Sequence, residues 1–260
     1  MSNPILPAEL LDHIFDHLDT THALRSCCLV SKSWIPCTRR HLFAEIKFNV
    51  GQELRSWRRT FPDPSTSPAC YAKTLSIYCL PAVAATDAEG GGWIRGFSRV
   101  VRLEVGSHSE AAIDPTVSFF PFHGFSSFIE SIRLNLAVLP SSRVFDLILS
   151  FPLLQDLSLT AYEVSTDNGD SPDAPPTVSQ PSTPPTFTGS LRLFVTQGGL
   201  SLITHRLLSL PAGINFREFS STWFHAEDPL LTMAVVERCS RTIETLDITC
   251  HLRTPISHRH

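Results

Sequence analysis

The chain has 260 residues, of which 42% are hydrophobic and 18% charged, and its formal net charge at pH 7 is -4. A chain of this length can bury a sizeable core, and its slight negative charge argues against a sequence-independent nucleic-acid binder. No stretch approaches the ~20 apolar residues of a membrane-spanning helix, and the first residues lack the features of a secretory signal. We therefore expect an intracellular protein, cytoplasmic or nuclear or both, that binds neither membranes nor nucleic acid.

Helical periodicity begins close to the N-terminus. Pro7 suits the first turn of a helix, and five apolar residues then recur at helical spacing: Leu10, Leu11, Ile14, Phe15 and Leu18. Residues 19–21 provide N-cap chemistry for a second helix from about His22. Pro36 fits best in the first turn of a third helix, because a proline inside a continuous helix would break its hydrogen bonds. The sequence therefore predicts three short helices.

Such a three-helix unit has little interior of its own, so apolar side chains on its outer faces are candidates for burial by another protein. Residues 4–48 resemble an F-box, with Leu6-Pro7 at its start and Leu29-Val30-Ser31-Lys32 shortly before Trp34. The resemblance implies a domain that binds a Skp-type adaptor and, through it, a cullin scaffold. It also implies that eight residues form or support this interface: Leu6, Pro7, Leu10, Ile14, Leu18, Leu24, Val30 and Trp34. We expect three others to fill the unit's own core: Leu11, Phe15 and Leu29.

Two short motifs allow other chemistry, which we consider less favourable. His13 and His17 stand one helical turn apart and could share a metal ion, but a docking helix also needs a polar outer face. In the connecting segment 49–70, residues 55–59 interleave Trp57 with arginines, as in a site that stacks on nucleic acid. We favour a solvated face, or packing of Trp57 between the F-box and the first repeat. Because no catalytic, nucleotide or metal motif appears, we expect a non-catalytic protein without a cofactor.

Beyond residue 70, the sequence repeats a pattern in which apolar residues occupy the first, fourth and sixth positions. The fourth residues of seven copies are Leu75, Leu103, Ile132, Leu157, Leu191, Phe219 and Leu246, at intervals of 28, 29, 25, 34, 28 and 27 residues. These intervals fall around the period of a leucine-rich repeat. The longest interval contains residues 165–186, which are rich in Pro, Ser, Thr and Asp and which we expect to form a disordered insertion.

Helical periodicity occurs between the copies, most clearly in residues 141–151, 200–210 and 227–241. Residues 87–98 and 107–122 are instead expected to form loops or short helical turns. A repeated strand and helix cannot bury its apolar face alone, so residues 71–252 predict a leucine-rich-repeat-like solenoid of about seven repeats, with a concave parallel sheet. The fold class is mainly α/β. No capping unit precedes the tail 253–260, so we expect the solenoid to be incomplete at this end or to pair through it.

Alternate side chains of each predicted strand point into the concavity. The candidate target-facing residues are Ser76, Glu104, Arg133, Ser158, Arg192, Ser220 and Asp247. Residues 222–250 resemble the repeat region of fungal F-box proteins with divergent leucine-rich repeats. Together the two resemblances imply a substrate-recognition adaptor of a Skp/cullin/F-box-type ubiquitin ligase, whose repeats bind an unknown target protein. The alternative is a non-catalytic interaction protein that uses its F-box outside ubiquitin transfer.

Overall fold

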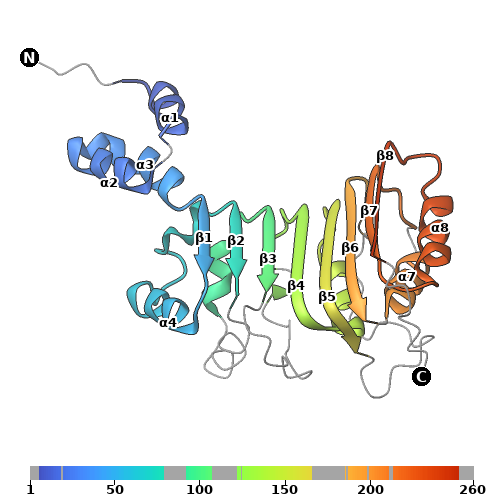
Figure 1. Cartoon of the computed structure of the whole chain (residues 1–260). Coiled ribbons are helices and arrows are strands. Elements are labelled where there is room, and N and C mark those ends of the chain that lie inside the picture. Colours follow the sequence, from blue (N-terminus) through green and yellow to red (C-terminus); the bar gives the residue numbers. More distant parts are fainter. Residues whose placement is uncertain are drawn as a thin grey trace, which may run out of the picture.

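The computed structural model describes residues 6–18, 20–78, 92–106, 122–123, 125–165, 185, 187–197, 199–210 and 213–251. Its architecture is mixed α/β: N-terminal helices precede a long, all-parallel sheet with alternating helices, an arrangement like that of leucine-rich repeats (Figure 1). Among the described residues, no helix is both long and apolar enough to cross a lipid bilayer.

The three predicted N-terminal helices are confirmed. Thr20 caps the second helix, because its Oγ1 accepts a hydrogen bond of 3.1 Å from the backbone N–H of Ala23. Pro36 lies in the first turn of the third helix, as predicted. The elements of this N-terminal part are α1 (Ala8–Asp16), α2 (Thr21–Val30), the 3₁₀ helix η1 (Lys32–Trp34) and α3 (Ile35–Leu42). Their small core consists of Leu11, Phe15, Leu24 and Cys37.

The sheet contains eight strands, which lie side by side in chain order (Figure 1). Seven of them are the predicted copies, and the fourth residues of these copies pair with one another across the sheet, from Leu75 in the second strand to Leu246 in the last. The strands are β1 (Glu45–Phe48), β2 (Thr74–Ile77), β3 (Arg102–Gly106), β4 (Ser131–Pro140), β5 (Asp156–Ser165), β6 (Ser190–Gln197), β7 (Glu218–Trp223) and β8 (Thr245–Cys250). The repeat pattern therefore sets the register of the sheet.

Strand β1 was not predicted, although it fits the repeat pattern. Phe43, Ile46 and Phe48 occupy the three apolar positions of this copy, and Ile46 pairs with Leu75. This copy overlaps the end of the stretch that resembles an F-box, and this overlap conceals the repeat pattern in the sequence. The sheet thus begins immediately after the last N-terminal helix.

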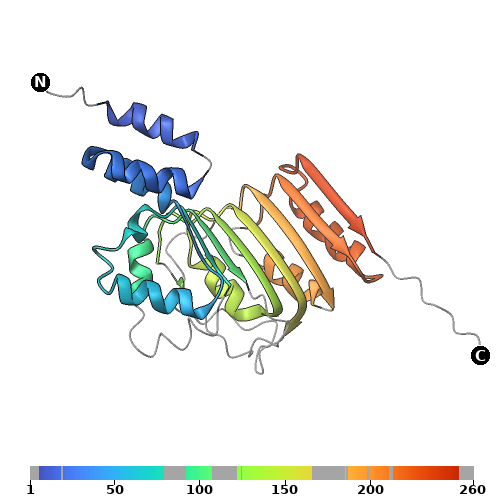
Figure 2. The same cartoon turned by 60° about the vertical axis from the view of Figure 1, so that its left-hand side comes forward.

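Helices and 3₁₀ turns between the strands cover one side of the curved sheet (Figure 2). The helices predicted within residues 141–151, 200–210 and 227–241 are confirmed, and within residues 87–98 a 3₁₀ helix spans residues 92–97. The elements are α4 (Gly51–Thr60), η2 (Pro68–Tyr71), η3 (Gly92–Phe97), α6 (Ser141–Leu149), α7 (Leu200–Leu208) and α8 (Asp228–Arg238). One continuous apolar core lies between these elements and the sheet, because each strand turns alternate residues towards them.

Several predicted segments fall outside the described residues. They are most of 107–122, the tail 253–260, and the insertion 165–186 apart from Ser165, which ends β5, and Pro185. At the last strand, β8, Leu246 is exposed, and no described strand pairs with its outer edge. The expectation that the solenoid is incomplete or pairs through this end stays a prediction.

Candidate partner-binding surfaces

The N-terminal part of the chain exposes several large apolar side chains to solvent, which is unfavourable unless a partner covers them. These exposed residues are Leu6, Leu10, Ile14, Leu29 and Val30. Leu11 and Phe15 are buried, as predicted, but the prediction that Leu29 fills the core is wrong, because its side chain is 89% exposed. Leu29 lies five residues after the buried Leu24, which places it about 140° further around the helix, away from the core.

The eight residues that the resemblance assigned to an adaptor interface fall into two groups. Leu6, Pro7, Leu10, Ile14 and Val30 are exposed and available to a partner. The other three, Leu18, Leu24 and Trp34, belong to or pack against the small core, and the Trp34 ring meets the Phe15 ring edge to face at 5.8 Å. Leu24 is buried, whereas Leu18 and Trp34 are half-buried, and all three support the surface through the packing of the helices.

Ion pairs hold α1 against α3 beside this apolar surface. Arg40 donates to Asp12 across 3.0 Å, and the His41 ring lies 3.4 Å from Asp12 and 3.5 Å from Asp16. The two contacts of His41 are ion pairs only when His41 is protonated. Because Asp12 and Asp16 share α1 with Leu10 and Ile14, these contacts help to orient the exposed apolar side chains.

All seven candidate target-facing residues lie in one row across the strands, on the side opposite the core. The row is Lys47, Ser76, Glu104, Arg133, Ser158, Arg192, Ser220 and Asp247, each paired in register with the next. Lys47 was missed together with β1. Side chains that are up to two hundred residues apart in the chain therefore form one continuous surface.

The β1–β4 end of this row is engaged in contacts of its own. Ser76 is buried and donates a hydrogen bond of 3.0 Å to Glu104, which also lies 3.5 Å from Arg133. Lys47 Nζ stands 4.9 Å from the centre of the Tyr78 ring, a cation–π geometry. Burial, together with a hydrogen bond to Glu104, raises the pKa of Tyr78 to about 12. A partner at this end would meet an ordered, internally paired surface.

The middle of the row forms the floor of a basic depression of about 670 Å³. Its charged lining consists of Lys73, Arg102, Arg133 and Arg192 against Glu130 and Asp156. Asp156 is already engaged, since its Oδ1 accepts hydrogen bonds from the Ser190 backbone N–H and hydroxyl at 2.6 and 2.8 Å. The side chain of Arg192 makes no hydrogen bond or ion pair with any residue that the structure describes. The depression therefore offers positive charge to a partner, although the chain as a whole is negative.

An aromatic group lies further along the strands β5 to β7 and was not predicted. Phe194 packs edge to face on Phe224 at 5.3 Å, and the Phe224 ring stacks on His251 at 5.7 Å. Tyr162 is exposed, and its hydroxyl accepts a hydrogen bond of 2.5 Å from the Gln197 amide. These residues escaped prediction because the repeat pattern covers six positions, whereas β5 and β6 continue beyond it.

Comparison with known families supports the interpretation of the N-terminal helices. A family model described as F-box-like matches residues 4–48, which include α1 to α3 and β1. Among curated proteins, no relative of the chain was found. The parallel sheet is consistent with leucine-rich repeats in architecture, but no family model identifies it as such. Residues 4–48 are thus an F-box-like domain, joined to a leucine-rich-repeat-like parallel sheet.

Proposed function

We propose that this protein is a substrate-recognition adaptor of a Skp/cullin/F-box-type ubiquitin ligase. The F-box-like domain binds a Skp-type adaptor, which links it to a cullin scaffold, and the concave side of the sheet binds a target protein. The protein performs no catalysis itself. It holds the target near a ubiquitin-transfer enzyme, and this proximity raises the effective concentration of the reacting groups. An intracellular location, cytoplasmic or nuclear, follows from this role.

The observation that carries the proposal is the imbalance between the core and the surface of the F-box-like domain. Four residues form its core, whereas five large aliphatic side chains are exposed on α1, on α2 and just before α1. Exposed aliphatic side chains are stabilised by burial against a partner, at about 25 cal/mol per Å² of apolar surface. The exposed part of the domain is therefore the natural docking surface for the adaptor.

The basic depression supports the second half of the proposal. Arg133, Ser158 and Arg192 are candidate target-facing residues that line it, and the Arg192 side chain has no partner among the described residues. Complementary charge steers a partner and selects against the wrong one. We therefore propose that the target presents an acidic segment to the concave side of the sheet.

Substitution of Leu10 tests the adaptor interface. Leu10 is 51% exposed on α1, so Leu10→Asp places a charge on the surface without opening the core. If Leu10 is buried in the complex, this change removes about 2 kcal/mol or more of binding free energy, which is about a 30-fold rise in Kd. The measurement is isothermal titration of the purified chain with a Skp-type adaptor.

Leu153→Asp is the matched control, because Leu153 is 47% exposed but lies just before β5, away from the F-box-like domain. It should leave the adaptor Kd within about twofold, since surface substitutions rarely have larger effects. Equal binding of the Leu10→Asp variant and the unaltered chain would contradict the proposed interface. Co-purification of the adaptor together with a cullin supports the ligase role, whereas recovery of the adaptor without a cullin favours an interaction protein that acts outside ubiquitin transfer.

A further inference from the structure

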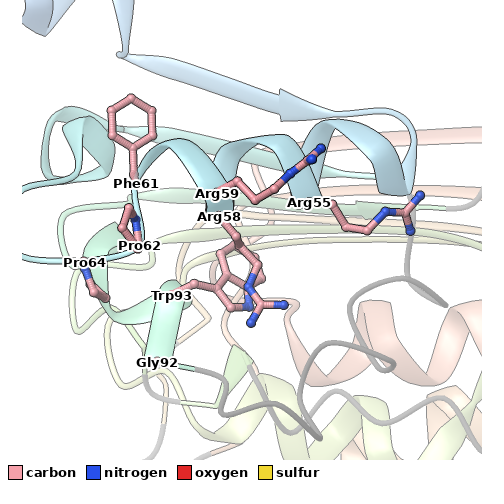
Figure 3. Close-up of a pocket in the computed structure, with 8 residues that line it drawn as sticks. All are labelled: Arg55, Arg58, Arg59, Phe61, Pro62, Pro64, Gly92 and Trp93. Carbon is pink, nitrogen blue, oxygen red and sulfur yellow. The ribbon is translucent and has the colours of Figure 1, made fainter.

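A second cavity lies beside α4 and η3, and it is lined by arginines. Its volume is about 660 Å³, and its walls are the side chains of α4, the segment that follows α4, and the start of η3 (Figure 3). The lining residues are Arg55, Arg58, Arg59, Phe61, Pro62, Pro64, Gly92 and Trp93. None of these residues belongs to the row of side chains proposed to meet a target.

The arginines gather here because the adjoining face of α4 is anchored in the core. Leu54 is buried, and Trp57 packs against Phe48 at 5.8 Å and Phe97 at 5.9 Å. At 100° per residue, positions 55, 58 and 59 then occupy one arc of the helix beside this anchored face. Figure 3 shows the three side chains extending from the same helix, with that of Arg58 directed towards Trp93.

The positive charge of the cavity is not balanced by its described lining. The side chains of Arg55 and Arg59 form no hydrogen bond or ion pair with residues that the structure describes, and the described lining of the cavity includes no acidic residue. The nearby acids on the same segment are engaged elsewhere. Glu53 accepts a hydrogen bond of 2.6 Å from the backbone N–H of Asn49, and Asp63 accepts two of 2.8 Å from Ser65. Arg55 and Arg59, one turn apart, therefore repel each other without compensation from these carboxylates.

An unsatisfied donor lies in the same wall. Trp93 is only 7% exposed, and its indole Nε1–H has no hydrogen-bond partner among the residues described. A buried N–H without a partner is unfavourable, and an indole nitrogen can only donate. The cavity therefore combines the guanidinium groups of Arg55 and Arg59 with a buried indole N–H, none of which has an acceptor among the described residues.

We propose that this cavity binds a phosphate monoester. A phosphate dianion offers three strong acceptor oxygens and up to two negative charges, which match the guanidinium groups of Arg55 and Arg59 and the indole N–H better than a single carboxylate. Phe61, Pro62 and Pro64 form an apolar wall on which the organic part of the monoester packs. The phosphate group comes either from a phosphorylated protein side chain or from a small organic phosphate.

Fluorescence titration of the full chain tests this proposal, because Trp93 lines the cavity and reports its occupancy. The probes are inorganic phosphate, phenyl phosphate and a capped phosphoserine peptide with its unphosphorylated form. We expect saturable binding of the phosphate probes, with phenyl phosphate tighter than inorganic phosphate because of the apolar wall. Tighter binding of the phosphoserine peptide than of phenyl phosphate assigns the ligand to a protein, and the reverse order assigns it to a small organic phosphate.

Two sets of variants distinguish the cavity from general electrostatic attraction. Arg55→Gln with Arg59→Gln should weaken phenyl phosphate binding about tenfold or more, since two charge-assisted contacts are lost. Arg25→Gln with Arg39→Gln removes the same charge from exposed arginines of α2 and α3, and should change the Kd by less than about twofold. Trp93→Phe keeps an aromatic ring but removes both the N–H and the fluorescent reporter, so its binding is measured by isothermal titration calorimetry, in which the affinity for phenyl phosphate should fall about fivefold.

Three results would overturn the proposal. The first is the absence of saturation by phenyl phosphate up to about 10 mM, which is weaker than any useful affinity. The second is equal weakening by the two arginine pairs, which would indicate attraction to the net charge alone. The third is full competition by chloride at the same ionic strength. The surface proposed for the adaptor lies on α1, on α2 and just before α1, so every one of these outcomes leaves the test with Leu10→Asp unaffected.

Discussion

Asp228 holds the turn between the seventh strand and the last helix, and its replacement should destabilise the C-terminal repeat. The side chain is 2% exposed, and its Oδ2 accepts hydrogen bonds from the backbone N–H groups of Phe224 at 2.7 Å and His225 at 2.8 Å. The carboxylate also stands at the first residue of α8, where the helix dipole favours negative charge.

The size of the effect follows from these two hydrogen bonds. Asp228→Ala removes both of them and leaves two backbone donors without an acceptor, at a cost of about 1.5 kcal/mol for each bond to a charged group. We therefore expect a loss of about 3 kcal/mol in the free energy of unfolding. In Asp228→Asn, the amide oxygen can take the position of Oδ2 and accept both bonds as a neutral group. Because neutral hydrogen bonds are about half as strong, the expected loss is about 1.5 kcal/mol.

Urea denaturation followed by tryptophan fluorescence measures the change, because the indole of Trp223 donates to Thr232 across the same turn at 2.9 Å. Native-state hydrogen exchange provides a local measurement on the amides of Phe224 and His225, which should exchange about a hundredfold faster in Asp228→Ala. Equal losses for the Ala and Asn variants, or a loss below about 1 kcal/mol for Ala, would refute the assigned role of the two hydrogen bonds.

Two further predictions concern the core and the thiols. Trp57 packs on four aromatic rings, at centroid distances of 4.7 to 6.2 Å. In urea denaturation, Trp57→Ala should therefore lower the free energy of unfolding by about 3 kcal/mol, and the exposed control Phe128→Ala by less than about 1 kcal/mol. Similar losses for the two variants would contradict this packing. Cys250 is exposed, whereas burial raises the pKa of the Cys239 thiol. At pH 8 the fast phase of reaction with a disulfide reagent should therefore lose about one thiol equivalent in Cys250→Ser and keep its amplitude in Cys239→Ser.

Local periodicity was sufficient to predict most of the secondary structure. The apolar positions that end in Leu75, Leu103 and Ile132 lie on successive strands in the predicted register, because a period of two directs alternate side chains to the same side. Helix boundaries were also predictable where a cap or a proline stands in the chain, as at Thr20 and Pro36. Packing of Trp57 at the junction, favoured over nucleic-acid stacking, is likewise observed against Phe43 and Phe48.

Other features depend on contacts between residues that are far apart in the chain. The periodicity of α2 did not reveal that Leu29 points away from the core, because this depends on where α1 and α3 pack. Ser76 was predicted to face a target, yet Glu104 from the next strand binds it, and it is buried.

The arginine-lined cavity has the same origin in long-range packing. It brings together Arg55 and Trp93, which no local pattern connects. The position of a side chain along the repeat is a property of its own segment, and the sequence predicts it. Its exposure, its charge partners and the cavities around it are properties of the neighbouring segments, and they are defined only when those segments pack together.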